Sequence, residues 1–340
     1  MSRPIPLIVS LDTEEDNWSR SRTGITVANI GELPRQAKFF ARLGVRPTYF
    51  TAYQVAIDSC AAAVMREVGT EAGAEIGAHL HPWNTPPLTE AFVPRNSMTR
   101  NLPAHLQLAK IQTLTAALEE AFGRRPVSFR AGRYGIGPET VAALQACGYL
   151  VDSSVSPFVS LEPVDDGPSF IGAPIVPYRV DPSADIRQES PNGALAEIPL
   201  SYGFSRGPFD VVEPFQRLLE ARPLRWLRAP GIAARTRLLR RLSLSPEFQS
   251  VEDMLTLSSR LLENGARHLH ISWHTPSLKP GLSPFTATAA DVERLYASIE
   301  AYFDGLVRVT SFECMTVSEA AALLLQPQLR EVIGVQEHRQ

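Results

Sequence analysis

Five short apolar runs, separated by four helix-length amphipathic segments, occupy the first 155 residues of this 340-residue chain. Alternation of this kind is typical of parallel strands joined by helical crossovers. It predicts a mainly parallel α/β fold, and the chain has the length of one barrel of about 250 residues carrying insertions. Strands are expected at 5–11, 46–51, 74–79, 127–129 and 149–152, and helices at 28–43, 54–68, 103–122 and 138–147.

The alternation is interrupted between residues 155 and 250, where Pro and Gly are frequent and only 196–200 has a clear strand pattern. Because the segments on either side look like parts of one sheet, we expect a single barrel domain over residues 1–325 with an insertion at about 155–250. A C-terminal tail at 326–340 follows. Beyond the insertion, helices are expected at 251–264, 288–304 and 316–325, and strands at 268–273 and 307–312.

Composition narrows the class of protein. The formal net charge is -3, which provides no cationic field for a phosphate backbone and argues against nucleic-acid binding. Apolar residues make up 44% of the chain, enough for a large core without disulfides, and the three widely spaced cysteines are expected to be reduced. The sequence shows neither a signal peptide nor a run of about 18 apolar residues, so a soluble, cytoplasmic protein is expected. Nothing in it specifies an oligomeric state.

The first expected strand ends in a run of acids that begins at Asp12 and continues through Glu14. Alternate residues of an extended segment point the same way, so these two carboxylates would share a face. Carboxyl ends of barrel strands are where catalytic side chains gather. A solvated acidic turn or helix-capping carboxylates are the commoner explanations for such a run.

A second pair of side chains follows the third expected strand, where His79 and His81 are separated by one residue. The spacing puts both imidazoles on one face, roughly 6.5 Å apart along the strand. Two imidazoles and one carboxylate form a set that leaves positions open for water and substrate, as in catalytic metal sites. Isolated histidines are more often packed or exposed without a ligand, and the acidic strand end is what favours a metal site here.

Three further strand ends carry candidates. Arg130 could hold a carboxylate ionised through a bidentate contact, and Asp152 could position Arg130, line the pocket or form a turn. In the late strand, alternation places His268, His270 and His274 on one face. Only His274 lies at the strand end, so we interpret the other two as structural.

Taken in order, these motifs resemble the polysaccharide deacetylases with the NodB homology domain. The motifs are the acid cluster, Glu-Ile-Gly-Ala-His-Leu-His-Pro, Phe-Arg before a Gly-rich turn, Gly-Tyr-Leu-Val-Asp-Ser-Ser and a late His after a strand. The similarity spans about residues 6–155 and 266–325, and Arg-Pro-Thr-Tyr-Phe-Thr at 46–51 adds to it. It implies an irregular (β/α)7-type barrel.

The resemblance also implies roles for individual residues. Glu14, His79 and His81 match the metal ligands, with a divalent ion such as Zn²⁺ as the cofactor. Two departures concern this set, since Asp-Thr-Glu replaces adjacent aspartates and the histidine spacing is two instead of four. Glu15 and Asp16 therefore stay as other candidates for the carboxylate ligand.

For catalysis, the resemblance makes Asp12 the general base, Arg130 the residue that holds it, Asp152 the fourth motif and His274 the general acid. The implied activity is metal-dependent removal of an N-acetyl or other N-acyl group from an amino sugar in a poly- or oligosaccharide. Two alternatives stay open: a hydrolase of a non-sugar amide on the same barrel, and a catalytically silent glycan-binding protein.

One feature lies outside the resemblance. Between Arg217 and Arg241 there are eight arginines interleaved with leucines and Trp226. A solvated helical hairpin is the simpler interpretation. The alternative is an amphipathic surface that makes peripheral contact with anionic lipid or a lipid-linked glycan.

Overall fold

A curled, mostly parallel sheet organises the protein in a computed structural model that describes residues 4–16, 20–71, 73–220 and 239–325. Its strand order is β10-β1-β2-β3-β4-β5-β7-β6, with β11 also paired to β1. Neighbouring strands are parallel except for the antiparallel pair β6 and β7. The strands are β1 (Ile5–Thr13), β2 (Thr48–Ala52), β3 (Glu75–Leu80), β4 (Ser128–Ala131), β5 (Val151–Asp152), β6 (Tyr178–Val180), β7 (Leu195–Glu197), β10 (Leu269–His274) and β11 (Phe312–Met315).

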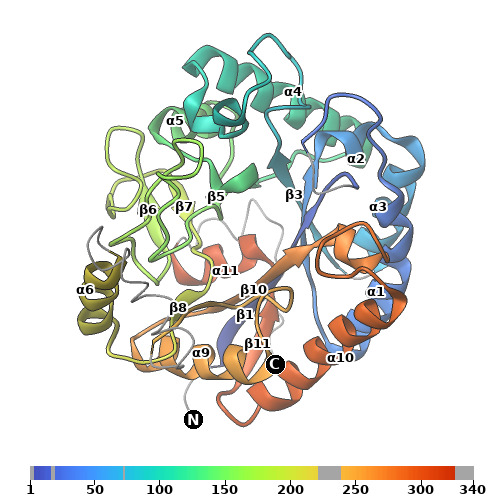
Figure 1. Cartoon of the computed structure of the whole chain (residues 1–340). Coiled ribbons are helices and arrows are strands. Elements are labelled where there is room, and N and C mark those ends of the chain that lie inside the picture. The colour runs from blue at the N-terminus through green and yellow to red at the C-terminus, as the bar shows by residue number, and fades with distance from the viewer. Residues whose placement is uncertain (1–3, 17–19, 72, 221–238, 326–340) are drawn as a thin grey trace.

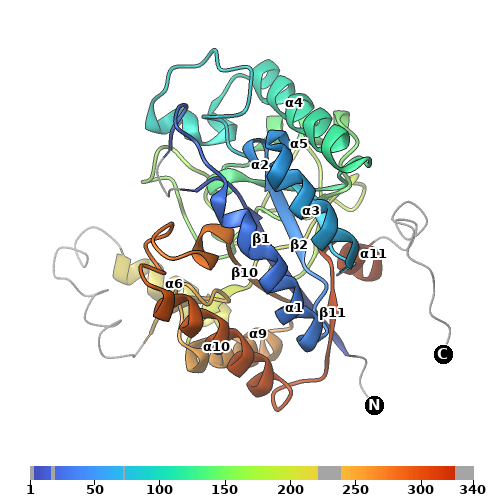
Figure 2. The ribbon, with the colours of Figure 1, turned by 90° about the vertical axis from the view of Figure 1, so that its right-hand side faces the viewer.

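Helices surround the outer face of this sheet, as Figures 1 and 2 show. Their ends follow local sequence signals: α1 and α4 each stop at a glycine with a left-handed backbone, Gly44 and Gly123, and α10 begins with a capping box of Thr288 and Asp291. The helices are α1 (Leu33–Leu43), α2 (Tyr53–Ile57), α3 (Ser59–Glu71), α4 (Ala104–Phe122), α5 (Pro138–Ala146), α6 (Phe209–Glu220), α9 (Val251–Glu263), α10 (Ala289–Leu306) and α11 (Val317–Leu324). The expected α/β barrel is therefore confirmed.

The last helix, α11, lies across the interior of the curled sheet (Figure 1). Its alanines pack against inward-facing apolar residues of β1, β2, β5 and β7. Two of its first backbone N–H groups are capped from the sheet, Val317 by the Thr48 hydroxyl and Ser318 by the Glu75 carboxylate. The helix thus fills the barrel at the amino ends of the strands and leaves the carboxyl ends accessible.

The segment from 155 to 250 contains β7, which overlaps the strand expected at 196–200, and adds three strands that the sequence did not reveal, β6, β8 (Tyr202–Phe204) and β9 (Arg241–Ser243). The last two form a small antiparallel sheet. Hydrogen bonds join its edge to β10, since Ser272 N–H donates to the Leu244 carbonyl and His270 N–H donates to the Ser201 hydroxyl. The part of this segment that follows β7 therefore bridges the space between β7 and β10.

Some expected boundaries are wrong. A strand is expected at 307–312, but β11 begins only at Phe312. The reason is that α10 continues to Leu306 and a turn follows it. The helix expected at 54–68 is divided at Asp58, which has an extended backbone and caps α3 by accepting from Ala61 N–H.

Parts of the other predictions lie outside the described residues. These parts are residues 221–238 of the arginine-rich segment and the tail at 326–340. The division into one domain with an insertion stays a prediction. At the described ends of the arginine-rich segment, Arg217 belongs to α6 and Arg240 pairs with Asp253. Among the helices described, none is both long and apolar enough to span a membrane.

The loop that follows β3 is held from behind by a buried lysine of α4. Lys110 Nζ donates to the carbonyls of Pro82, Thr85 and Pro87 at 2.7–2.9 Å and lies 3.2 Å from Glu90. This side chain is fully buried, and burial lowers its pKa. Three carbonyls therefore depend on one ammonium group, which shares the Glu90 carboxylate with Arg22 and fixes the loop carrying His81.

We expect Lys110→Met to destabilise the protein by about 3–5 kcal/mol, because it leaves three buried carbonyls without their donor and the buried Glu90 carboxylate with Arg22 as its remaining ion-pair partner among the described residues. Urea unfolding followed by circular dichroism measures the loss. The control Lys38→Met, at an exposed position on α1, should stay within about 0.5 kcal/mol of wild type. Equal midpoints for the two variants would contradict the role given to Lys110.

Candidate metal centre and active site

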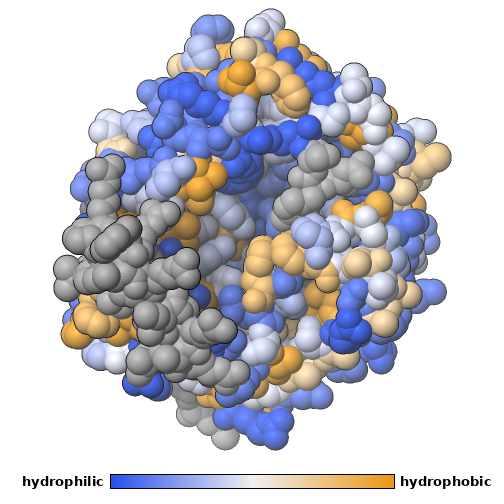
Figure 3. Space-filling view, viewed as in Figure 1, coloured by the Kyte–Doolittle hydropathy of each residue, from blue (hydrophilic) through white to orange (hydrophobic). Residues whose placement is uncertain are grey.

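A cavity of about 450 Å³ opens at the carboxyl ends of β1, β3 and β10. In Figure 3 this face of the molecule is hollowed at its centre, and hydrophilic residues form much of the upper border. Six of the predicted site residues come together here, five of them as lining residues and Arg130 directly behind Asp12. The lining residues used below are Asp12, Glu14, Glu15, Arg20, His79, His81, Trp83, Arg133, Tyr134, Tyr202 and His274.

Glu14, His79 and His81 form the group of described residues whose arrangement fits a metal ion. One ligand atom from each lies within 4.8 Å of the others. Glu14 Oε2 is 3.5 Å from His79 Nε2 and 3.2 Å from His81 Nε2. The i, i+2 spacing on β3 and the end of β1 therefore converge on one point, as the strand geometry predicts.

The other ring nitrogens are already engaged. His79 Nδ1 lies 3.1 Å from the Arg130 carbonyl, and His81 Nδ1 lies 2.9 Å from Glu15 Oε1. Each contact requires a proton on Nδ1, so in the neutral rings the Nε2 lone pairs face the Glu14 carboxylate. Two lone pairs and a carboxylate oxygen directed at one another repel unless a cation lies between them. The donor set therefore fits a divalent metal.

Electrostatics lead to the same conclusion. Burial by itself lowers the pKa of His81, but the carboxylates of Glu15 and Glu14 outweigh it and raise that pKa to about 10. Burial raises the pKa of Glu14, yet the two histidines reverse this and bring it well below its usual range. The site thus attracts positive charge, whether as protons or as a metal ion.

Asp12 stands between this cluster and His274. Its Oδ2 is 3.8 Å from His79 Nε2 and 3.8 Å from His274 Nε2, while Oδ1 accepts from Arg130 Nη1 at 2.6 Å. Burial raises the pKa of Asp12, but Arg130 and then the two imidazoles outweigh it and lower the pKa. Asp12 is therefore an ionised carboxylate with one oxygen held and the other facing the cavity.

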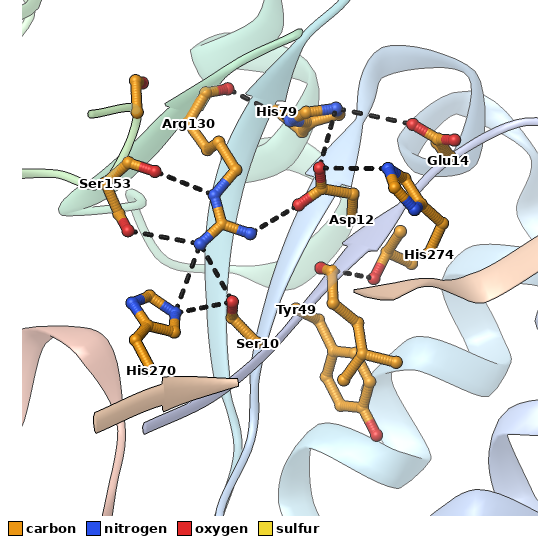
Figure 4. A network of polar contacts seen from close by, with 12 residues as sticks. Ser10, Asp12, Glu14, Tyr49, His79, Arg130, Ser153, His270 and His274 are labelled. Carbon is orange, nitrogen blue, oxygen red and sulfur yellow. Dashed lines mark hydrogen bonds and ion pairs between the residues drawn. The ribbon is translucent and has the colours of Figure 1, made fainter. Parts of the chain in front are cut away.

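Arg130 itself is completely buried, and Figure 4 shows its guanidinium surrounded by acceptors. Nε donates to the Ser153 carbonyl at 2.9 Å, and Nη2 donates to Ser10 Oγ at 2.9 Å and lies 3.3 Å from His270 Nε2. Burial and the neighbouring Arg130 lower the pKa of His270, so its neutral ring can accept from the guanidinium. His270 thus supports Arg130, whereas His268 is buried elsewhere against the Pro199 carbonyl.

His274 has a partner that the sequence did not reveal. Its Nδ1 lies 2.8 Å from Glu247 Oε2, a side chain that is fully buried and comes from the insertion. Burial lowers the pKa of His274, but Glu247 outweighs it and raises the pKa to about 10. An acid 27 residues earlier in an irregular segment has no local pattern that marks it as this partner.

Asp152 has a different environment from the one expected. It lines none of the cavity, and its oxygens accept from Ser154 N–H and Ser154 Oγ. It also contacts Glu197, its neighbour in register on β7, and burial raises the pKa of both carboxyl groups. Among the described contacts of Arg130, Ser153 holds the position considered for Asp152. A catalytic role for Asp152 stays a prediction.

The other two candidate acids, Glu15 and Asp16, and two tryptophans near the site also have defined contacts. Glu15 lies behind His81 and Asp16 accepts from the N–H groups of Ala28 and Asn29, which leaves Glu14 on the side of the two Nε2 atoms. Trp83 stacks on His81 with ring centroids 4.1 Å apart and lines the cavity. Trp273 is a core residue, 1% exposed and packed edge-on against Phe40.

Comparisons with solved structures identify the fold. A protein from Mycobacterium smegmatis assigned to the polysaccharide deacetylases superposes with a TM-score of 0.50 and 16% identity, covering 100% of this chain and 96% of its own. The chain has the polysaccharide deacetylase fold. This confirms the resemblance seen in the motifs at the level of the fold.

Two other solved structures match with lower identity. The 4-α-glucanotransferase of Thermococcus litoralis matches with a TM-score of 0.50 and 11% identity over 94% of this chain and 40% of its own. The Xyl-CE4 domain of a xylanase from the hindgut metagenome of Trinervitermes trinervoides matches with 0.45 and 11% over 99% and 95%. No family model and no curated protein sequence matches the chain.

We expect the wild-type protein to bind one equivalent of Zn²⁺, and His79→Ala or His81→Ala to weaken binding at least about 100-fold because each removes a ligand. Glu15→Gln should weaken it about 10- to 100-fold, since Glu15 only orients His81. Isothermal titration calorimetry measures these affinities. The control His105→Gln, at an exposed position on α4, should match wild type. Unchanged affinity in both alanine variants would remove the site.

Proposed function

We propose that the protein is a metal-dependent hydrolase that removes N-acyl groups, chiefly N-acetyl, from an amino sugar of a poly- or oligosaccharide. The observation that carries the proposal is the position of Asp12, with its free oxygen 3.8 Å from both His79 and His274. One side of this carboxylate faces the metal-capable cluster and the other faces a protonated imidazole. Amide hydrolysis needs this combination of base, electrophile and acid.

Glu14, His79 and His81 would hold the metal ion, for which two imidazoles and one carboxylate favour Zn²⁺. When bound, such an ion polarises the acyl carbonyl and lowers the pKa of a water molecule towards neutrality.

Two side chains of the protein then move protons. Asp12 Oδ2 accepts a proton from the water whose oxygen attacks the acyl carbon, while Arg130 holds Oδ1 in place. His274 donates a proton to the departing nitrogen as the C–N bond breaks, because an amine leaves poorly unless it is protonated. A backbone N–H near Tyr134 is a candidate donor to the oxyanion. The products are a carboxylate and a free amino sugar.

The sugar in this proposal is supported by three observations. The fold is that of a protein assigned to the polysaccharide deacetylases. The cavity volume suits one or two sugar rings. Trp83 and Tyr134 in its wall offer aromatic surface of the kind that packs on sugar rings. A cytoplasmic location stays a prediction from the sequence.

Release of acetate from N-acetylglucosamine oligomers, with Zn²⁺ added, tests the proposal. Asp12→Asn should lower kcat/KM about 10²- to 10⁴-fold through loss of the base. The exposed control Asp304→Asn should keep wild-type activity. Hydrolysis of small amides but of no oligosaccharide would favour the non-sugar alternative. Oligosaccharide binding without acetate release would favour the glycan-binding one.

The pH profile tests the proton donor separately. Glu247 raises the pKa of His274 to about 10, so the donor stays charged through neutral pH and loss of its proton should lower activity only in the alkaline range. In Glu247→Gln that support is removed and burial lowers the pKa. The alkaline limb of kcat/KM should then move to lower pH, while the zinc affinity stays unchanged. An unmoved alkaline limb would contradict the assignment of His274 as the acid.

A further inference from the structure

Two guanidinium groups lie at the rim of the cavity, apart from the metal-capable cluster. Arg20 and Arg133 both line the cavity and both contact Ser97 Oγ and Asp165 Oδ2. Arg133 Nη1 is 2.7 Å and Arg20 Nη1 is 3.4 Å from that carboxylate oxygen. The side chain of Arg133 is 27% exposed and that of Arg20 is 35% exposed, so both reach solvent at the cavity mouth.

The charges at this rim do not balance. Two guanidinium groups share the single carboxylate of Asp165, and within the described part of the chain both interact with it only through Nη1. No described residue accepts from the Nε or Nη2 of either arginine, so these donors can serve solvent or a ligand. The acids at the cavity floor, in contrast, face Arg130 and the imidazoles of His79, His81 and His274. A surplus of positive charge and several unused N–H donors therefore remain at the mouth.

Arg133 is held there by a strained turn. Arg133 and Tyr134 have φ angles of 54° and 56°, a left-handed conformation that is strained for a residue with a Cβ. Gly132 before them is packed so closely that a Cβ would meet the Leu80 carbonyl at 2.5 Å and the His81 ring at 2.6 Å. Strain of this kind concentrates at binding and catalytic sites. The turn brings the guanidinium to the cavity that the metal-capable cluster also borders.

We propose that Arg20 and Arg133 bind an anionic group of the substrate, a carboxylate or a phosphate, next to the N-acylated sugar. Guanidinium forks match both groups because they can form two parallel charge-assisted hydrogen bonds. Asp165 orients Nη1 of each arginine, and the anion takes the outward-facing donors. The inference rests on the proposed function for the reaction, and adds that the preferred glycan is acidic.

The experiment compares three N-acetylated substrates. One is a neutral trisaccharide of N-acetylglucosamine, the second carries glucuronic acid in place of one unit, and the third is N-acetylglucosamine 1-phosphate. At low salt, kcat/KM for one of the anionic compounds should exceed that of the neutral one at least tenfold. Which of the two anionic compounds is preferred shows whether the arginines bind a carboxylate or a phosphate. This preference should shrink in 0.5 M NaCl, because the rim is exposed and screened.

Variants locate the effect. Arg133→Gln should reduce the anion preference at least tenfold, and Arg20→Gln should reduce it in the same direction without touching the strained turn. The matched control Arg95→Gln removes a neighbouring exposed arginine, paired with Asp166, that does not line the cavity. It should keep the wild-type preference. Equal preference in wild type, Arg133→Gln and Arg20→Gln would overturn the proposal.

Binding measurements test the anion site independently of the proposed reaction. If no substrate is hydrolysed, the proposed function fails, and calorimetry with the same compounds still decides the role of the rim. Tighter binding of an anionic compound, lost in Arg133→Gln and retained in Arg95→Gln, supports the anion site. Equal affinity for neutral and anionic compounds, or no binding of either, rejects it.

Discussion

The contact between Arg130 and Asp12 constrains the whole site, because a guanidinium with no exposure to solvent must find acceptors for nearly all its N–H groups. These come from β1, from the segment after β5 and from β10, through Asp12, Ser10, Ser153 and the ring of His270. The sheet has to curl for all of these to reach one point. The ion pair therefore ties the curvature of the barrel to the ionised state of the carboxylate in its mouth.

The parallel register of the strands also positions the residues of the metal-capable cluster. His79 is the β3 neighbour of Arg130, and the carbonyl of that same arginine fixes the proton of the imidazole. Asp12 is likewise the register neighbour of His274 on β10. Two pairs of register neighbours thus set the site, His79 beside Arg130 and Asp12 beside His274. Small shifts in pairing would separate them, which is why such sites are built on strand ends.

The segment from 155 to 250, expected to be an insertion, completes the site that the other strands begin. It bridges β7 and β10, and it contributes Glu247 behind His274 and Tyr202 in the cavity wall. Asp165, which holds the two arginines at the rim, comes from the same segment. The barrel strands thus position the reacting groups, while the insertion governs the charge of the acid and the shape of the mouth.

From sequence alone, the alternation of strands and helices determined the α/β barrel, because short apolar runs and amphipathic segments have different periods. The one-residue spacing in Asp12-Thr13-Glu14 and His79-Leu80-His81 likewise determined shared faces at strand ends. The tertiary structure decided which acid meets the two Nε2 atoms, since Glu15 and Asp16 are equally near in sequence but turn to His81 and Asn29. It also decided the pairing of His274 with Glu247 and of Arg20 and Arg133 with Asp165. Such contacts join distant segments without a period, so only packing of the folded chain specifies them.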